Sequence, residues 1–162
     1  MKTTIISGFP GVGKTTCRNK PGLFDSRVLD MESSAYSWIF DSFDSNCKPK
    51  ANPEFPKNYI DSLELFSDKG GYEYIFISSH ENVRKELQKR GVKYIIVAPK
   101  NTPEIKNEYC KRYLKRGSDV DLIDKVYRNW DTMIASIESD SVPTIWLDKG
   151  EYLADVLSQE GE

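Results

Sequence analysis

The residues with the clearest chemical meaning form a glycine-rich run near the amino terminus. Gly8-x-x-x-x-Gly13-Lys14-Thr15 matches the phosphate-binding P-loop pattern in full. Glycines let backbone N–H groups turn inward around an anion, while the lysine adds a mobile positive charge. We expect Lys14 to bind the β- and γ-phosphates of ATP and Thr15 to offer its hydroxyl to Mg²⁺. The residues expected to contact this nucleotide are Gly8, Gly11, Val12, Gly13, Lys14, Thr15 and Thr16.

A pair of acids follows the second apolar run of the sequence. Asp30 and Glu32 are two residues apart, so on an extended chain both can project towards one site. One could hold the water shell of Mg²⁺ while the other accepts the proton of an acceptor hydroxyl. The alternative is structural, with Glu32 in the first turn of a helix that Asp30 caps. We predict Asp30 as a metal partner and leave open which acid is the general base.

The third apolar run ends at Ile77 and is followed by Ser78, Ser79 and His80. It lacks the aspartate with which an ATPase motor holds magnesium and positions water, which argues against a hydrolase and leaves Asp30 as the best metal partner. His80 is the only histidine of the chain. It is predicted either to meet the substrate or to support the start of the next helix.

A basic segment, Lys100 to Arg116, follows the fourth apolar run. Arg112 and Arg116 are four residues apart and share one face of a helix. Arginines brought in by a closing lid can neutralise charge that develops on the γ-phosphate. A solvated basic helix face is the plain alternative. We favour the catalytic reading because a lid is useful at this point of the chain.

These side chains need a scaffold, and the order of apolar runs and helical patterns predicts one. The runs are apolar throughout, as expected of strands covered on both faces, and helical segments separate them. They are Thr3–Ser7, Arg27–Asp30, Tyr74–Ser78, Lys93–Ala98 and Thr144–Leu147. This alternation predicts an α/β three-layer sandwich around a five-stranded parallel sheet.

Helix signals lie between the runs. Ser78-x-x-Glu81 reads as a capping box, and Thr102-Pro103 opens the basic helix. A short terminal helix is expected over Glu151–Leu157. One face of a long helix is expected to consist of Val120, Ile123, Tyr127, Trp130, Ile134 and Ile137.

Composition and the placement of the prolines predict how the chain is organised into a domain and its segments. With 162 residues and a net charge of −2, we expect a single domain over 1–162 that no global field draws to nucleic acid or anionic lipid. Three scattered cysteines favour a reducing, cytoplasmic setting, and the first apolar run is too short to span a membrane, so no membrane partner is expected. Phe43–Pro56 is proline-rich and predicts a loop within an acceptor-binding appendage at about 33–71. A lid-like segment is expected at about 100–117.

The P-loop, the acid after the second run and the basic segment together resemble the small P-loop kinases. These include nucleoside monophosphate kinases, shikimate and gluconate kinases and the kinase domain of polynucleotide kinase. The resemblance spans most of the chain and implies the strand order 2-3-1-4-5. It also implies that Arg112 and Arg116 belong to the lid, and that Asp148-Lys149-Gly150 contacts adenine, which adds Lys149 to the nucleotide site.

A closer resemblance is to small phage-encoded nucleotide kinases, and to phage kinases that phosphorylate 5-hydroxymethyluracil in DNA. Their features are similar to Asp30–Ser34, Phe55–Ile60, Ser79–Arg84 and Arg112–Gly117. The resemblance implies that the protein is located in the cytoplasm, that of the host cell if it is encoded by a phage. It also implies acceptor contacts from Ser33, Ser34, Asn58, Tyr59, His80 and Arg84.

Three functions therefore stay open. The first is an ATP- and Mg²⁺-dependent kinase whose acceptor is a nucleotide-type small molecule, foremost a (deoxy)nucleoside monophosphate. The second is a kinase acting on a hydroxyl of DNA, either a modified base or a 5′ end. The third is a nucleotide-binding module without useful catalysis. Acceptor identity and oligomeric state are not encoded in any local pattern.

Overall fold

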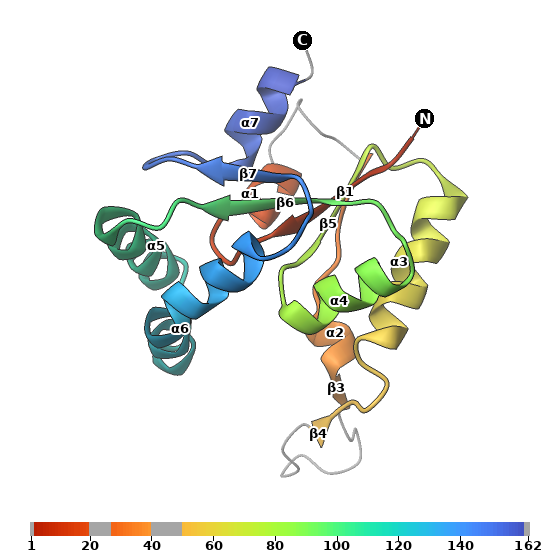
Figure 1. Ribbon diagram of the computed structural model, residues 1–162, viewed down its shortest axis with the longest axis horizontal. Helices are drawn as coiled ribbons and strands as arrows, with labels where there is room; N and C mark the ends of the chain where they lie inside the picture. Colours follow the sequence, from red (N-terminus) through yellow and green to blue (C-terminus); the bar gives the residue numbers. More distant parts are fainter. Residues whose placement is uncertain (1, 20–26, 40–49, 161–162) are drawn as a thin grey trace.

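The protein is built on one five-stranded parallel sheet flanked by helices (Figure 1). The structure is a computed structural model and describes residues 2–19, 27–39 and 50–160. The sheet order is β2-β5-β1-β6-β7, which is the predicted order 2-3-1-4-5 of the five apolar runs. The strands are β1 Thr4–Gly8, β2 Val28–Asp30, β5 Tyr74–Ser78, β6 Ile95–Pro99 and β7 Thr144–Leu147. The predicted fold class is thus confirmed.

Helices follow the strands and pack in neighbouring pairs. The main contacts between helices join α1 to α7, α3 to α4 and α5 to α6. Their bounds are α1 Lys14–Asn19, α2 Ser34–Ser37, α3 Lys57–Lys69, α4 Glu81–Lys89, α5 Pro103–Lys115, α6 Val120–Glu138 and α7 Leu153–Glu160. The helix start at Thr102-Pro103 is confirmed, since the Thr102 side chain accepts a hydrogen bond from the Ile105 N–H.

Three local predictions need correction. Ser78 ends β5 and does not cap a helix, because α4 begins at Glu81 after His80. The terminal helix runs from Leu153 and not from Glu151. On α6, Val120 is 72% and Tyr127 48% exposed, since the buried face starts only at Val126 and runs through Trp130, Ile134 and Ile137, which leaves Tyr127 beside it.

The predicted appendage at about 33–71 contains a short antiparallel hairpin that the sequence pattern does not predict. Strand β3 (Trp38–Ile39) pairs with β4 (Lys50–Ala51), although the latter falls within the predicted loop Phe43–Pro56. Residues 43–49 of that loop lie outside the described residues. The two strands are exposed and contain no alternating apolar run, so no periodic signal marks them.

The core lies beneath the P-loop and is rich in aromatic side chains. Phe9 packs edge-on against Trp130, with ring centroids 5.2 Å apart, and against Tyr109 at 6.1 Å. All three are fully buried, so β1, α5 and α6 are joined directly below the loop. Within the described residues, no helix is both long and apolar enough to cross a lipid bilayer.

Candidate active site

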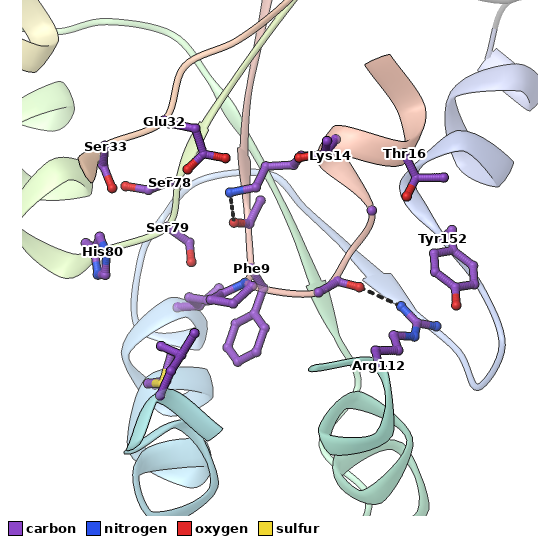
Figure 2. A pocket seen from close by; sticks show the side chains of 18 of the residues that line it. Phe9, Lys14, Thr16, Glu32, Ser33, Ser78, Ser79, His80, Arg112 and Tyr152 are labelled. Carbon is purple, nitrogen blue, oxygen red and sulfur yellow. Dashed lines mark hydrogen bonds between the residues drawn. The ribbon is translucent and has the colours of Figure 1, made fainter. Parts of the chain in front are cut away.

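The P-loop connects β1 to α1 at the carboxyl edge of the sheet. Gly11 and Gly13 have φ values of 94° and 96°, a region that side chains disfavour. At Gly8 an added Cβ would lie 2.9 Å from Cδ of Lys14, so glycine here leaves room for the lysine to fold back over the loop. The Lys14 ammonium then donates a hydrogen bond to the Gly8 carbonyl at 3.1 Å (Figure 2).

Lys14 is a buried cation among opposing charges. Burial lowers the pKa of Lys14, and the nearby Arg116 lowers it further. Asp30 and Glu32 act in the other direction and raise it. The ammonium therefore sits where both predicted acids and one predicted arginine act on it, which is the arrangement expected of a phosphate-binding lysine.

Thr15 and Asp30, the two predicted metal ligands, are in direct contact. The Thr15 hydroxyl donates a hydrogen bond to Oδ2 of Asp30 at 3.1 Å. Hard oxygen donors of this kind suit Mg²⁺, which takes few protein ligands and completes its shell with water and substrate phosphates. The pair fits the expected metal, with Thr15 coming from α1 and Asp30 from the end of β2.

A cavity of about 1370 Å³ opens in front of the loop. Pockets of this kind commonly hold 300–1,000 Å³, so this one has room for more than a triphosphate. Glu32 lines it and lies on the Lys14 side of the cavity (Figure 2). Other predicted site residues that line it are Gly8, Gly11, Gly13, Lys14, Thr15, Thr16, Ser33, Ser34, His80, Arg84, Arg112 and Arg116.

One part of the cavity wall carries hydroxyl groups and an imidazole. Ser33 and Ser34 begin α2, while Ser79 and His80 follow β5 (Figure 2). Partial burial, together with the positive charges of nearby basic side chains including Lys14, lowers the pKa of His80. A neutral imidazole beside hydroxyl groups is suited to hydrogen bonding with an uncharged polar ligand.

Asn58 and Tyr59 support this wall from behind, in place of the predicted acceptor contact. Tyr59 is fully buried, and its hydroxyl donates to the Met31 carbonyl at 2.6 Å while accepting from the Ser78 N–H at 3.2 Å. The Asn58 amide donates to the Tyr36 carbonyl at 2.9 Å. Neither residue lines the cavity, because both side chains are used to join α3 to the segments after β2 and β5.

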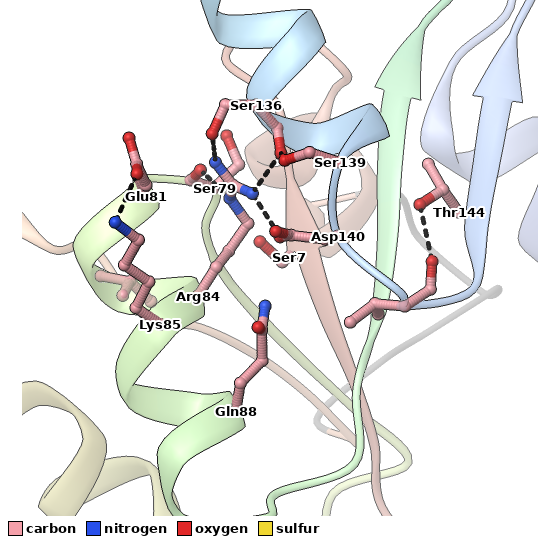
Figure 3. A network of polar contacts seen from close by, with 12 residues as sticks. Ser7, Ser79, Glu81, Arg84, Lys85, Gln88, Ser136, Ser139, Asp140 and Thr144 are labelled. Atoms are coloured by element: carbon pink, nitrogen blue, oxygen red, sulfur yellow. Dashed lines mark hydrogen bonds and ion pairs between the residues drawn. The ribbon is translucent and has the colours of Figure 1, made fainter.

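Arg84 is held by a network of polar contacts. Its side chain is 3% exposed and pairs with Asp140, and it donates to the Ser79 carbonyl at 2.9 Å and to the Ser136 hydroxyl at 2.6 Å (Figure 3). The guanidinium is therefore neutralised and fully engaged where it borders the cavity. It fixes the end of α6 to α4, and its predicted contact with the acceptor stays a prediction.

The two arginines of α5 have different surroundings. Arg112 lies between the rings of Tyr109 and Tyr152, with centroid distances of 4.4 and 3.8 Å, and donates to the Gly11 carbonyl at 2.8 Å (Figure 2). Arg116 is exposed at the cavity; its guanidinium donates a hydrogen bond to the Ser118 hydroxyl at 2.9 Å and lies 5.0 Å from the centroid of the Tyr113 ring. Both arginines line the cavity, and the guanidinium of Arg116 is the more exposed of the two; contact of either with a phosphate stays a prediction.

The helix that carries these arginines is packed on the molecule along its length. Ile105, Tyr109 and Tyr113 of α5 are buried. In the structure, α5 packs against the P-loop. The lid-like role of 100–117 stays a prediction. The Tyr113 hydroxyl donates to the Pro10 carbonyl at 2.6 Å, a contact across 103 residues that no local sequence pattern reveals.

Two predicted nucleotide contacts lie outside the main cavity. Val12 is fully buried, and its N–H donates to the Phe9 carbonyl at 3.1 Å within the turn. Lys149 borders a separate hollow of about 300 Å³ beside Glu108 and Lys111. Its contact with adenine remains a prediction.

The fold has a counterpart among solved structures. The tunicamycin resistance protein of Deinococcus radiodurans superposes with a TM-score of 0.58 at 17% sequence identity, over 97% of this chain and 91% of that one. No protein-family model and no curated protein matches the sequence. The shared feature is the fold. In this chain the fold places the Gly8–Thr15 loop between β1 and α1 of a five-stranded parallel sheet flanked by helices.

Proposed function

We propose that this protein is a Mg²⁺-dependent phosphotransferase that moves the γ-phosphate of ATP to a nucleotide-type acceptor, foremost a (deoxy)nucleoside monophosphate. The observation that carries the proposal is that Lys14, Thr15 and Glu32 line one cavity, with Asp30 hydrogen-bonded to Thr15 and acting electrostatically on Lys14. A cavity larger than a triphosphate supports a second substrate beside the donor.

In the donor half of the site, a lysine side chain and a metal ion would share the binding of the phosphates. Lys14 would hold the β- and γ-phosphates, and Thr15 with Asp30 would hold Mg²⁺, which supplies charge neutralisation at the phosphate oxygens when bound. Arg116 has an exposed guanidinium whose positive charge acts on Lys14. It would stabilise the transferring phosphoryl group.

The acceptor half assigns separate roles to the two acids. Because the Asp30 carboxylate already accepts from Thr15, Glu32 is the acid free to face the acceptor from the cavity wall. In the transfer, the acceptor oxygen forms a bond to the γ-phosphorus while the bond to the β–γ bridging oxygen breaks and ADP leaves. A hydroxyl acceptor passes its proton to Glu32, whereas an ionised phosphate acceptor has none to give.

The decisive experiment follows the label. ATP labelled at the γ-phosphate is incubated with mononucleotides, nucleosides, plain DNA and 5-hydroxymethylated DNA, with and without Mg²⁺. We expect a mononucleotide to gain the label. Label in a nucleoside or in DNA would move the acceptor to a hydroxyl, and label in free phosphate alone would refute the kinase proposal.

A matched variant separates a kinase from a nucleotide-binding module. In a kinase, Asp30→Asn loses turnover and still binds ATP, because the carboxylate acts through the metal. If the variant and the native protein bind ATP alike and neither labels any acceptor, the site binds nucleotide without transferring phosphate.

A further inference from the structure

The backbone of the P-loop is held from outside at three successive carbonyl groups. The Pro10 carbonyl accepts from the Tyr113 hydroxyl at 2.6 Å, and the Gly11 carbonyl accepts from Arg112 at 2.8 Å. The Val12 carbonyl accepts from the Leu153 N–H at 2.8 Å. Two of these donors are side chains of α5, about a hundred residues away in the chain, and the third begins α7.

Fixing a carbonyl also fixes the amide beside it. A peptide unit is planar and trans, so its N–H points opposite to its C=O. When the carbonyls of residues 10, 11 and 12 point outward to α5 and α7, the N–H groups of residues 11, 12 and 13 are directed to the inner side of the turn. The 3.1 Å contact between the Val12 N–H and the Phe9 carbonyl across the turn agrees with that direction.

The approach of α5 to the loop is close enough to require glycine. A Cβ at Gly11 would lie 2.8 Å from Cε1 of Tyr113 and 3.1 Å from Cδ2 of Tyr109. Glycine here therefore serves two purposes, a φ of 94° and the contact with the tyrosine rings. The second purpose is specific to this packing.

Arg112 joins the three segments into one unit. Besides Gly11, its guanidinium donates to the Glu151 carbonyl at 2.9 Å, and Glu108 accepts from it at 3.3 Å. The same Glu108 carboxylate accepts from the Gly150 N–H at 2.9 Å. With its side chain 9% exposed and flanked by two aromatic rings, Arg112 has little freedom to turn towards a ligand.

We propose that Tyr113 and Arg112 are positioning residues that preorganise the P-loop for triphosphate binding by holding the Pro10 and Gly11 carbonyls outward. This inference rests on the proposed phosphate-binding role of the loop. It replaces the direct catalytic role expected for Arg112 with an indirect one, exerted through the backbone. A preset nest binds an anion without first ordering the loop, so the effect belongs to phosphate affinity.

The test uses Tyr113→Phe and Arg112→Lys, with Tyr109→Phe as the matched control. Tyr109 is on the same helix and equally buried, but its hydroxyl makes no hydrogen bond of ordinary geometry with the described residues. Two quantities are measured on the full chain. The first is amide hydrogen exchange over residues 9–14 without nucleotide, and the second is the Kd of inorganic tripolyphosphate.

We expect both test variants to exchange faster over the loop and to bind tripolyphosphate about five- to tenfold more weakly, the effect of one lost hydrogen bond. Tyr109→Phe should match the native protein in both measurements. Loop exchange equal to that of the control would overturn the proposal. Faster exchange with unchanged tripolyphosphate affinity would overturn it as well, because the loop would then be held without being preorganised.

Failure of the proposed function gives a different pattern. If Lys14→Ala leaves tripolyphosphate affinity unchanged, the loop is not a phosphate site, and both proposals fall together. If Lys14→Ala loses affinity while Tyr113→Phe and Arg112→Lys do not, only the positioning proposal falls. An Arg112→Lys variant that keeps its affinity but loses turnover would return Arg112 to the catalytic group.

Discussion

The Thr15 hydroxyl and the Asp30 carboxylate are joined by a hydrogen bond of 3.1 Å that links the start of α1 to the end of β2. The residues are fifteen positions apart in the chain, and strand order brings them together, because β1 and β2 flank β5. Their oxygens form the part of the site suited to a hard divalent cation.

Replacing Asp30 tests this pair. We expect Asp30→Asn to raise the Mg²⁺ concentration needed for half-maximal turnover by about 10–100-fold, because the amide loses the charge that orients the metal and its water shell. The affinity for ATP without metal should stay close to native. The measurement is a magnesium titration of turnover, with the exposed Asp68→Asn of α3 as control. Equal titration curves for the two variants would contradict the assignment.

Glu32 is expected to act on the acceptor and not on the donor. Glu32→Gln should lower kcat about 10²–10⁴-fold for a hydroxyl acceptor, because the amide cannot take the proton. The KM for ATP should change little. Steady-state kinetics with each labelled acceptor measure this. A large rise in KM for ATP at unchanged kcat would instead assign Glu32 to donor binding.

The buried Lys14 predicts how the free energy of unfolding changes with pH. Burial lowers the pKa of Lys14 below the ordinary value of 10.5. Between the lowered value and 10.5 the unfolded chain binds more protons, so the free energy of unfolding rises with pH in that window. Lys14→Met has no such group, and the native protein should gain stability relative to it as pH rises towards 10.5.

Urea denaturation of the nucleotide-free protein across that range measures the difference. Lys85→Met is the matched control, since it removes a lysine whose side chain is 71% exposed. A native protein that loses stability relative to Lys14→Met over the same window would contradict the lowered pKa.

The Arg84–Asp140 pair is expected to contribute to stability. Asp140→Asn or Arg84→Met leaves a charge uncompensated in a nearly dry setting and should cost about 3–5 kcal/mol of unfolding free energy. The Lys85–Glu81 pair on the same helix, with side chains 71% and 57% exposed, provides the comparison. Lys85→Ala should cost about 0–1 kcal/mol.

Chemical denaturation of the single and double variants measures the coupling between Arg84 and Asp140. A double variant much more stable than the sum of its single variants predicts is the expected result. Independent, additive losses would mean that the two side chains do not act as a pair.

Local patterns determined the fold and the backbone shape of the Gly8–Thr15 loop. Apolar runs separated by helical segments predict a parallel sheet, because a strand covered on both faces must be apolar throughout. The spacing from Gly8 to Thr15 predicts the phosphate loop, because glycine conformation and lysine charge are properties of the residues themselves. The structure agrees with these two predictions because both depend on residues that are close together in the sequence.

Tertiary packing alone decided which polar side chains face the cavity. Tyr59, Arg84 and Arg112 have the residue types of ligand contacts, yet each is committed to backbone carbonyls or a buried partner. The Met31 carbonyl lies 28 residues from Tyr59, the Gly11 carbonyl 101 residues from Arg112, and Asp140 lies 56 residues from Arg84. Whether a buried donor is free depends on what the fold places beside it, and no spacing in the sequence contains that information.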